Sequence, residues 1–327
     1  MRSTTLWATA ALALSAVLSA CQKQELESTP VVLPNFKVEQ GMLHFETTAD
    51  YQTMTDMPSE GLRSAFLQKV RSEPGFTSAE RALGSGSRSV DQDLLFLIDD
   101  PYFREMLNEN LCVWIDDHIF RVNPEDGKVY VIPSSGVGDK YDDLLAQNTD
   151  DEDVREFPID VNVLDEVDRP DALWPFCSES GVPAQNPDPI AFNDNSGRTA
   201  TARYAKYGIY FTVFAKVEPV NSSGPFMDFY FKGIGPWDMG EGKVFYRQKC
   251  GNTVDYKSRS QGTWQLNNRR FQSYQGSKGL NRLYFYFRPI KLDCPDPVSE
   301  GVVIGNDGDP CAEPFFTDAW VGFQHNY

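Results

Sequence analysis

The chain has 327 residues, a formal net charge of −17 at pH 7, and 41% hydrophobic residues. Proteins that bind a phosphate backbone need a basic surface, so this charge argues against a nucleic-acid partner. The length is sufficient for one large domain or two modest ones.

The first residues have the features of a secretory signal that ends in a lipid-attachment site. Arg2 precedes an apolar run from Leu6 to Leu18, which fits a signal-peptide core but is too short for a membrane-spanning helix of ~20 residues. LSAC, at residues 18–21, resembles the bacterial lipobox. The resemblance implies that residues 1–20 are removed and that Cys21 carries lipid, palmitate included. The alternative is an ordinary secretory signal with a chance cysteine.

Residues 21–41 are predicted to be a lipid-anchored tether, because they are polar, contain two prolines and show no helical or strand period. Attached acyl chains would hold the protein at a bilayer, at ~0.8 kcal/mol for each buried methylene. Gln22 follows the cysteine, which does not resemble the inner-membrane retention signal of enteric bacteria. We therefore expect an outer-membrane lipoprotein of the cell envelope that faces the periplasm or the cell surface.

Residues 42–170 are predicted to form a small α+β region with an acidic tail. A short strand is expected at residues 42–45, and Thr47 or Thr48 can cap the helix after it. The residues at helical spacing in the next segment are Leu62, Phe66, Leu67 and Val70. Pro74–Gly75 is predicted to end that helix. More helix is expected on both sides of residues 99–100, with a break before Pro101, because the residue that precedes a proline is disfavoured in a helix.

The stretch NLCVWIDDHIFRVNPEDGKVYVIP, residues 110–133, predicts three strands joined by two turns. Only Asp116 and Asp117 separate the first two strands, which is the length of a tight hairpin turn. Aspartate tolerates the positive φ that such turns require. The alternative is an acid/base or metal site made by these two carboxylates and His118. Because a hairpin tip lacks the concave pocket that most sites need, we interpret the stretch as a turn.

Three runs in this half of the chain follow a common pattern: GFTSAERAL, DPYFREMLNENLCVWIDDHIFRV and KVYVIP. Together they resemble an uncharacterised family of lipoproteins from the Bacteroidota, over roughly residues 40–135. The resemblance implies a β-rich tail, but no known activity and no catalytic residues. Cys112 and Trp114, in the first strand of the hairpin, depart from the family pattern.

Negative charge is concentrated in residues 91–170, which hold 22 Asp and Glu against 6 Lys and Arg. Four acids are consecutive at residues 150–153, namely Asp150, Asp151, Glu152 and Asp153. An EF-hand loop needs ligands at alternating positions, a central glycine and a terminal glutamate, and this run has no such spacing. We interpret it as solvated surface and NDGD at residues 306–309 as a turn, with weak calcium binding as the alternative and no other cofactor expected.

Residues 171–197 are predicted to be a linker, since the surrounding segment is rich in proline and has no period. Residues 198–327 read as repeated strands separated by Gly, Asn and Asp. Leu283, Phe285 and Phe287 alternate there with Tyr284, Tyr286 and Arg288. This pattern indicates an antiparallel β-sandwich-like region, or an open barrel.

Two tryptophans of this C-terminal region are candidate ligand-binding residues. Trp237 lies in a glycine-rich segment with Asp238 and Glu241 beside it, and Trp264 lies in SQGTWQLNNRR. A tryptophan ring can stack on a sugar while nearby polar groups bind its hydroxyls. Core packing is the alternative for both rings.

Five cysteines follow Cys21, so at least one is unpaired within a monomer. Cys294 and Cys311 flank a loop rich in Pro, Gly and Asp and are the pair best placed for a disulfide. No C-x-x-C spacing is present, which argues against zinc.

No catalytic motif is found: there is no G-x-S-x-G elbow, no H-E-x-x-H and no glycine-rich phosphate loop. A carboxylate-pair glycosidase stays open, because 47 acids offer many pairs. The leading hypothesis is a non-enzymatic envelope lipoprotein that binds or assembles with a partner. The alternatives are a glycan-binding or glycan-processing lipoprotein that uses the C-terminal aromatic residues, and a structural subunit of a surface fibre.

Overall fold

The structure is a computed structural model. It describes residues 32–56, 58–85, 94, 97–167, 184–186, 188–191, 199–218, 229–233, 245–248, 264–265, 270–291, 315–316 and 321–325. Cys21, the signal peptide and most of the linker and tether therefore lie outside the described residues.

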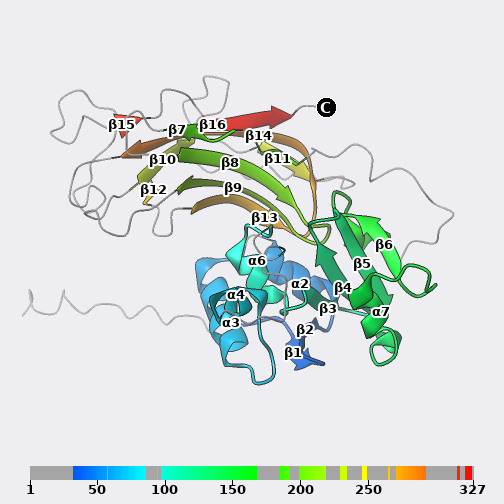
Figure 1. Cartoon of the computed structure of the whole chain (residues 1–327). Helices are drawn as coiled ribbons and strands as arrows, with labels where there is room; N and C mark the ends of the chain where they lie inside the picture. Colours follow the sequence, from blue (N-terminus) through cyan, green and yellow to red (C-terminus); the bar gives the residue numbers. More distant parts are fainter. Residues whose placement is uncertain are drawn as a thin grey trace, which may run out of the picture. The chain divides into compact units, whose positions relative to one another are not determined.

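The N-terminal half contains a six-stranded sheet in the order β1-β2-β3-β4-β5-β6 (Figure 1). Its strands are β1 (Phe36–Glu39), β2 (Met42–Phe45), β3 (Cys112–Ile115), β4 (His118–Asn123), β5 (Lys128–Pro133) and β6 (Arg155–Pro158). All neighbours are antiparallel except β2 and β3, which are parallel. A parallel pair needs a long crossover, and here helices supply it. The predicted three-strand meander is confirmed as β3 to β5, while β1 and β6 were not predicted.

Four described helices lie in the crossover between β2 and β3: α2 (Thr48–Thr55), α3 (Glu60–Ser72), α4 (Ala79–Ser85) and α6 (Pro101–Met106). Two short helices, α7 (Tyr141–Ala146) and α8 (Val163–Glu166), follow the meander. The Thr47 hydroxyl accepts from the Asp50 amide at the start of α2, so the predicted cap is confirmed. The α3 helix ends at Ser72, just before the predicted stop at Pro74–Gly75.

Buried aromatic rings join α3 to the sheet. The Phe66 ring lies 5.1 Å from that of Phe36 on β1 and 6.2 Å from that of Phe45 on β2. It also meets Tyr102 of α6 at 6.0 Å. Phe66 and Val70 are buried as the helical period predicts, whereas Leu67 is only partly buried. The apolar stripe of α3 is therefore narrower than the sequence indicates.

The C-terminal half is antiparallel throughout the described residues. One sheet has the order β13-β9-β8-β7, and a second has β11-β14-β10-β12 with β15 and β16 also paired to β14. The strands of the first are β7 (Ile190–Ala191), β8 (Thr199–Lys206), β9 (Phe211–Glu218) and β13 (Arg270–Gly276). Those of the second are β10 (Phe229–Gly233), β11 (Phe245–Gln248), β12 (Trp264–Gln265), β14 (Leu280–Lys291), β15 (Phe315–Phe316) and β16 (Val321–His325). The α+β class is confirmed, and the sandwich and the domain boundaries stay predictions.

The crossover helices bond directly to the sheet of β8, β9 and β13. The Tyr51 hydroxyl of α2 donates to the Ile209 carbonyl at 3.2 Å. The Asp56 carboxylate accepts from the Ser277 amide at 2.7 Å. The Phe103 ring of α6 stacks on that of Tyr210 at 4.5 Å. These contacts connect residues far apart in sequence, so the helices and this sheet share one packed interface.

A buried carboxylate lies at the centre of this interface. Asp100 is 1% exposed and caps α6, where its Oδ1 accepts from the Tyr102 and Phe103 amides at 2.9 and 3.3 Å. Its Oδ2 accepts from the Tyr210 hydroxyl and from Gln272 Nε2, both at 2.9 Å. A buried charge is costly unless it is fully hydrogen-bonded. These four donors therefore offset the desolvation cost of the Asp100 carboxylate.

Replacing Asp100 with Ala should lower the free energy of unfolding by about 3 kcal/mol, since it removes a helix cap and leaves buried donors unsatisfied. Urea denaturation measures this. Asp142→Ala, which removes an exposed acid from the first turn of α7, should cost only a few tenths of a kcal/mol and serves as the control. Equal losses in the two variants would contradict a central role for Asp100.

Gly208, in the turn between β8 and β9, should not tolerate a side chain. Its φ is +75°, and a Cβ there would lie 2.5 Å from Val129 Cγ2 and 3.0 Å from Val163 Cγ2. Gly208→Ala should therefore lower the free energy of unfolding by about 2–4 kcal/mol. Gly84→Ala in α4, where a Cβ meets nothing within 4 Å, should leave the urea midpoint unchanged or raise it slightly. A neutral Gly208→Ala would refute the close packing of this turn.

Candidate functional site

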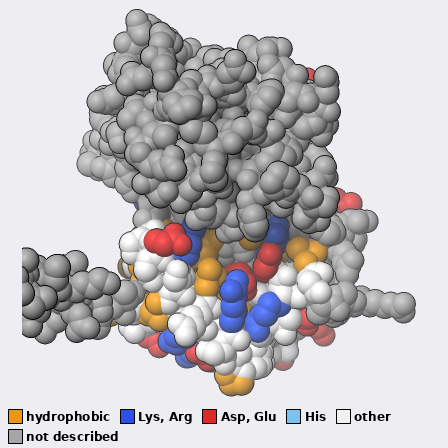
Figure 2. Space-filling model, turned by 90° about the vertical axis from the view of Figure 1, so that its left-hand side faces the viewer, with side chains coloured by type: hydrophobic (Ala, Val, Ile, Leu, Met, Phe, Trp, Pro, Cys, Tyr) orange, Lys and Arg blue, Asp and Glu red, His pale blue; other side chains and the backbone are white. Residues whose placement is uncertain are grey.

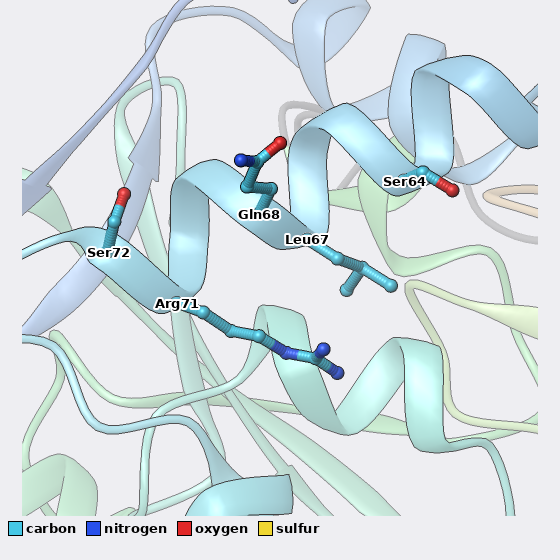
Figure 3. Close-up of a pocket in the computed structure, with 5 residues that line it drawn as sticks. All are labelled: Ser64, Leu67, Gln68, Arg71 and Ser72. Atoms are coloured by element: carbon cyan, nitrogen blue, oxygen red, sulfur yellow. The ribbon is translucent and has the colours of Figure 1, made fainter.

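A hollow of about 460 Å³ lies beside α3 (Figure 3). Its described lining is Ser64, Leu67, Gln68, Arg71 and Ser72. These positions are three and four residues apart, so successive members lie next to one another along the helix surface. Four of the five lining residues are exposed and Leu67 is half-buried, so the hollow is an open depression on the surface and not an enclosed cleft.

Arg71 is the charged member of the lining, and a buried acid holds it in place. Its Nε and Nη2 donate to the same oxygen, Glu105 Oε1, at 2.9 and 2.7 Å. The other oxygen of Glu105 accepts from the Ser78 hydroxyl at 2.7 Å. The Glu105 side chain is 3% exposed, whereas that of Arg71 is 57% exposed. The ion pair therefore has a fixed, buried end and an accessible end at the hollow.

The remaining lining is polar apart from one leucine. In Figure 3, Leu67 and Arg71 extend to one side of the helix and Gln68 and Ser72 to the other. The described lining holds two serine hydroxyls but no histidine or carboxylate that could activate them as nucleophiles. The described lining offers hydrogen-bond donors, hydrogen-bond acceptors and one apolar contact.

The helices around the hollow are more basic than the rest of the chain. Within their bounds, α3, α4 and α6 hold five basic residues and three acids, a net charge of +2 in a chain of −17. The bases are Arg63, Lys69, Arg71, Arg81 and Arg104, and the acids are Glu60, Glu80 and Glu105. Figure 2 shows this side of the molecule, with Lys and Arg side chains near its middle. When the caps Glu73 of α3 and Asp100 of α6 are counted as well, these helices hold five basic residues and five acids, so this surface is neutral in a strongly acidic chain.

Asp116 and Asp117 form the hairpin turn that the sequence predicts, with Ile115 paired to His118 across it. Asp116 has a φ of +54°, whereas Asp117 does not have a positive φ, so the turn is not of type I′, which requires positive φ at both positions. Both aspartates are exposed. With Thr48 and His118 they line a cavity of about 70 Å³, too small for more than a few waters.

The described residues contain no group of three or more His, Cys, Asp or Glu that could hold a metal ion. Within the acidic run, Asp151 and Asp153 both lie near Lys140, the latter at 3.9 Å. NDGD at residues 306–309 lies outside the described residues, so calcium binding there stays a prediction.

The candidate ligand-binding residues Trp237, Asp238 and Glu241 lie outside the described residues, as do Cys294 and Cys311. Trp264 lies on β12, opposite Phe231 of β10, with only its backbone described. These sequence predictions are therefore untested. The α3 hollow was not predicted, because its polar residues read as the solvent face of an amphipathic helix.

No protein-family model, curated protein or solved structure matches this chain. The resemblance to lipoproteins of the Bacteroidota therefore stays a prediction. Among the described residues, no helix is long and apolar enough to cross a membrane.

Cys112 should be chemically inert in the folded protein. It is buried in the cluster on the β3–β5 face, and burial raises the pKa of its thiol to about 12. At pH 8 its thiolate fraction is then roughly a thousandfold below that of an ordinary thiol. Iodoacetamide at pH 8, followed by peptide mass spectrometry, should modify Cys112 in urea but not in buffer. Equal modification in both would contradict its burial.

Proposed function

We propose that this protein is a lipid-anchored protein of the bacterial outer membrane that acts by binding or assembly and not by catalysis. The observation that carries the proposal is LSAC at residues 18–21, which follows an apolar run of signal-peptide type. The α3 hollow supports the binding role, because its described lining offers hydrogen-bonding groups and no activated nucleophile. The predicted tether would keep this surface close to the membrane.

For the C-terminal region we propose that the two antiparallel sheets pack face to face as a sandwich. Their antiparallel order supports this, as does the approach of β14 and β16 to β8. Glycan binding through Trp237, Asp238, Glu241 and Trp264 is the alternative function of this region, and the sequence pattern alone supports it.

Lipid attachment can be tested with the full chain produced in a Gram-negative host fed an alkyne-bearing palmitate. The wild-type protein should take up the label and sediment with outer membranes, because acyl chains bury methylenes in the bilayer. Cys21→Ala should lose the label and retain the signal peptide, as read by intact mass.

Cys112→Ala is the matched control and should be labelled as strongly as wild type, because its thiol is buried in the fold. A label that persists in Cys21→Ala would refute lipid attachment at this residue.

A further inference from the structure

We propose that the α3 hollow binds an acidic sugar, with the carboxylate of the ligand against Arg71 and its hydroxyls against the neighbouring polar side chains. This inference rests on the binding role proposed above and names the ligand class and the site.

The first support is that Arg71 is already positioned for a ligand. Both of its hydrogen bonds to Glu105 come from the Nε–Nη2 edge of the guanidinium. From Nη1 the structure gives no hydrogen bond to any described residue, and the side chain is 57% exposed. Glu105 is fixed by burial and by Ser78. A ligand that bonds to Nη1 therefore does not have to immobilise a flexible side chain, which favours affinity.

The second support is charge. A guanidinium binds carboxylate oxygens with strong, directional hydrogen bonds. Glu105 offsets the charge of Arg71, and with their caps Glu73 and Asp100 the surrounding helices are neutral in a chain of −17. An anion at the hollow therefore meets no net negative charge from these helices, and Arg71 supplies the specific contact.

The third support is the rest of the lining. Ser64, Gln68 and Ser72 supply two hydroxyls and an amide, and each can both donate and accept. Sugar hydroxyls have the same dual capacity, and Leu67 offers an apolar contact for the C–H groups of a sugar ring. Arginine side chains also recognise acidic peptide motifs, so an acidic peptide is the competing ligand that the test below distinguishes.

The test is calorimetric titration of the full-length protein, purified from membranes in neutral detergent, with tetragalacturonate. Its methyl ester is the matched probe, since it keeps the hydroxyls and removes the charge. The acid should bind, and the ester should bind about tenfold or more weakly, because the lost bonds are to a charged group. Equal binding of acid and ester would overturn recognition by Arg71. Equal binding of tetraglutamate would overturn the sugar part of the proposal.

The variant Gln68→Trp tests whether the ligand binds in the α3 hollow. Gln68 is exposed, so a larger side chain there fills the hollow without disturbing the core, and binding should fall at least tenfold. Thr53→Trp, at an exposed position of α2 outside the lining, should bind as wild type does. Undiminished binding by Gln68→Trp would overturn this location. Absence of binding in protein that still carries the palmitate label would overturn this inference and leave lipid attachment standing.

Discussion

The Asp100 carboxylate is the constraint on which the arrangement of the described residues depends. A charge with 1% exposure must have its hydrogen bonds satisfied by the protein, and the four donors described above come from α6, from Tyr210 in the turn before β9, and from β13. Two of these donors, on Tyr210 and Gln272, are 110 and 172 residues away in sequence. The carboxylate can therefore be satisfied only when the crossover helices lie against the C-terminal sheet. Gln272 extends the network, because its Oε1 accepts from Arg63 of α3 at 3.3 Å.

The same network reaches the candidate site through α6. This helix has only six residues, so the cap at Asp100 also fixes Glu105, which lies within the same helix. Glu105 in turn holds Arg71 at the edge of the hollow, while Arg104 pairs with Glu80 of α4 at 2.5 Å. Partly buried ion pairs of this kind contribute little net stability compared with apolar packing, but they fix geometry. The guanidinium at the hollow is thus positioned by the packing of two regions that are distant in sequence.

Local patterns predicted the parts of this fold that are determined locally. The cap at Thr47, the end of α3 before Pro74–Gly75 and the Asp116–Asp117 turn each depend on a few adjacent residues. The strand β1 was missed because its residues lie in a segment with two prolines that reads as a tether, and β6 was missed because REFP shows no apolar alternation. The pair of Arg71 and Glu105 spans 34 residues, so no local period could indicate it. Nothing in the sequence of α3 distinguishes a hollow from an ordinary solvent face, since both favour serine, glutamine and arginine.

Net charge is a poor guide to the ligand of such a surface, because charge acts over a short range in salt. The acidic run at residues 150–153 directly precedes β6, at one edge of the six-stranded sheet, whereas α3 packs on β1 at the other edge. Five strand spacings separate these edges, roughly 24 Å at ~4.8 Å for each spacing. The screening length at physiological ionic strength is about 8 Å, so charges next to β6 contribute little to the potential at α3. The charges close to α3 therefore matter most, and with their caps Glu73 and Asp100 the local helices hold five basic residues and five acids, so this surface is neutral in a chain of −17.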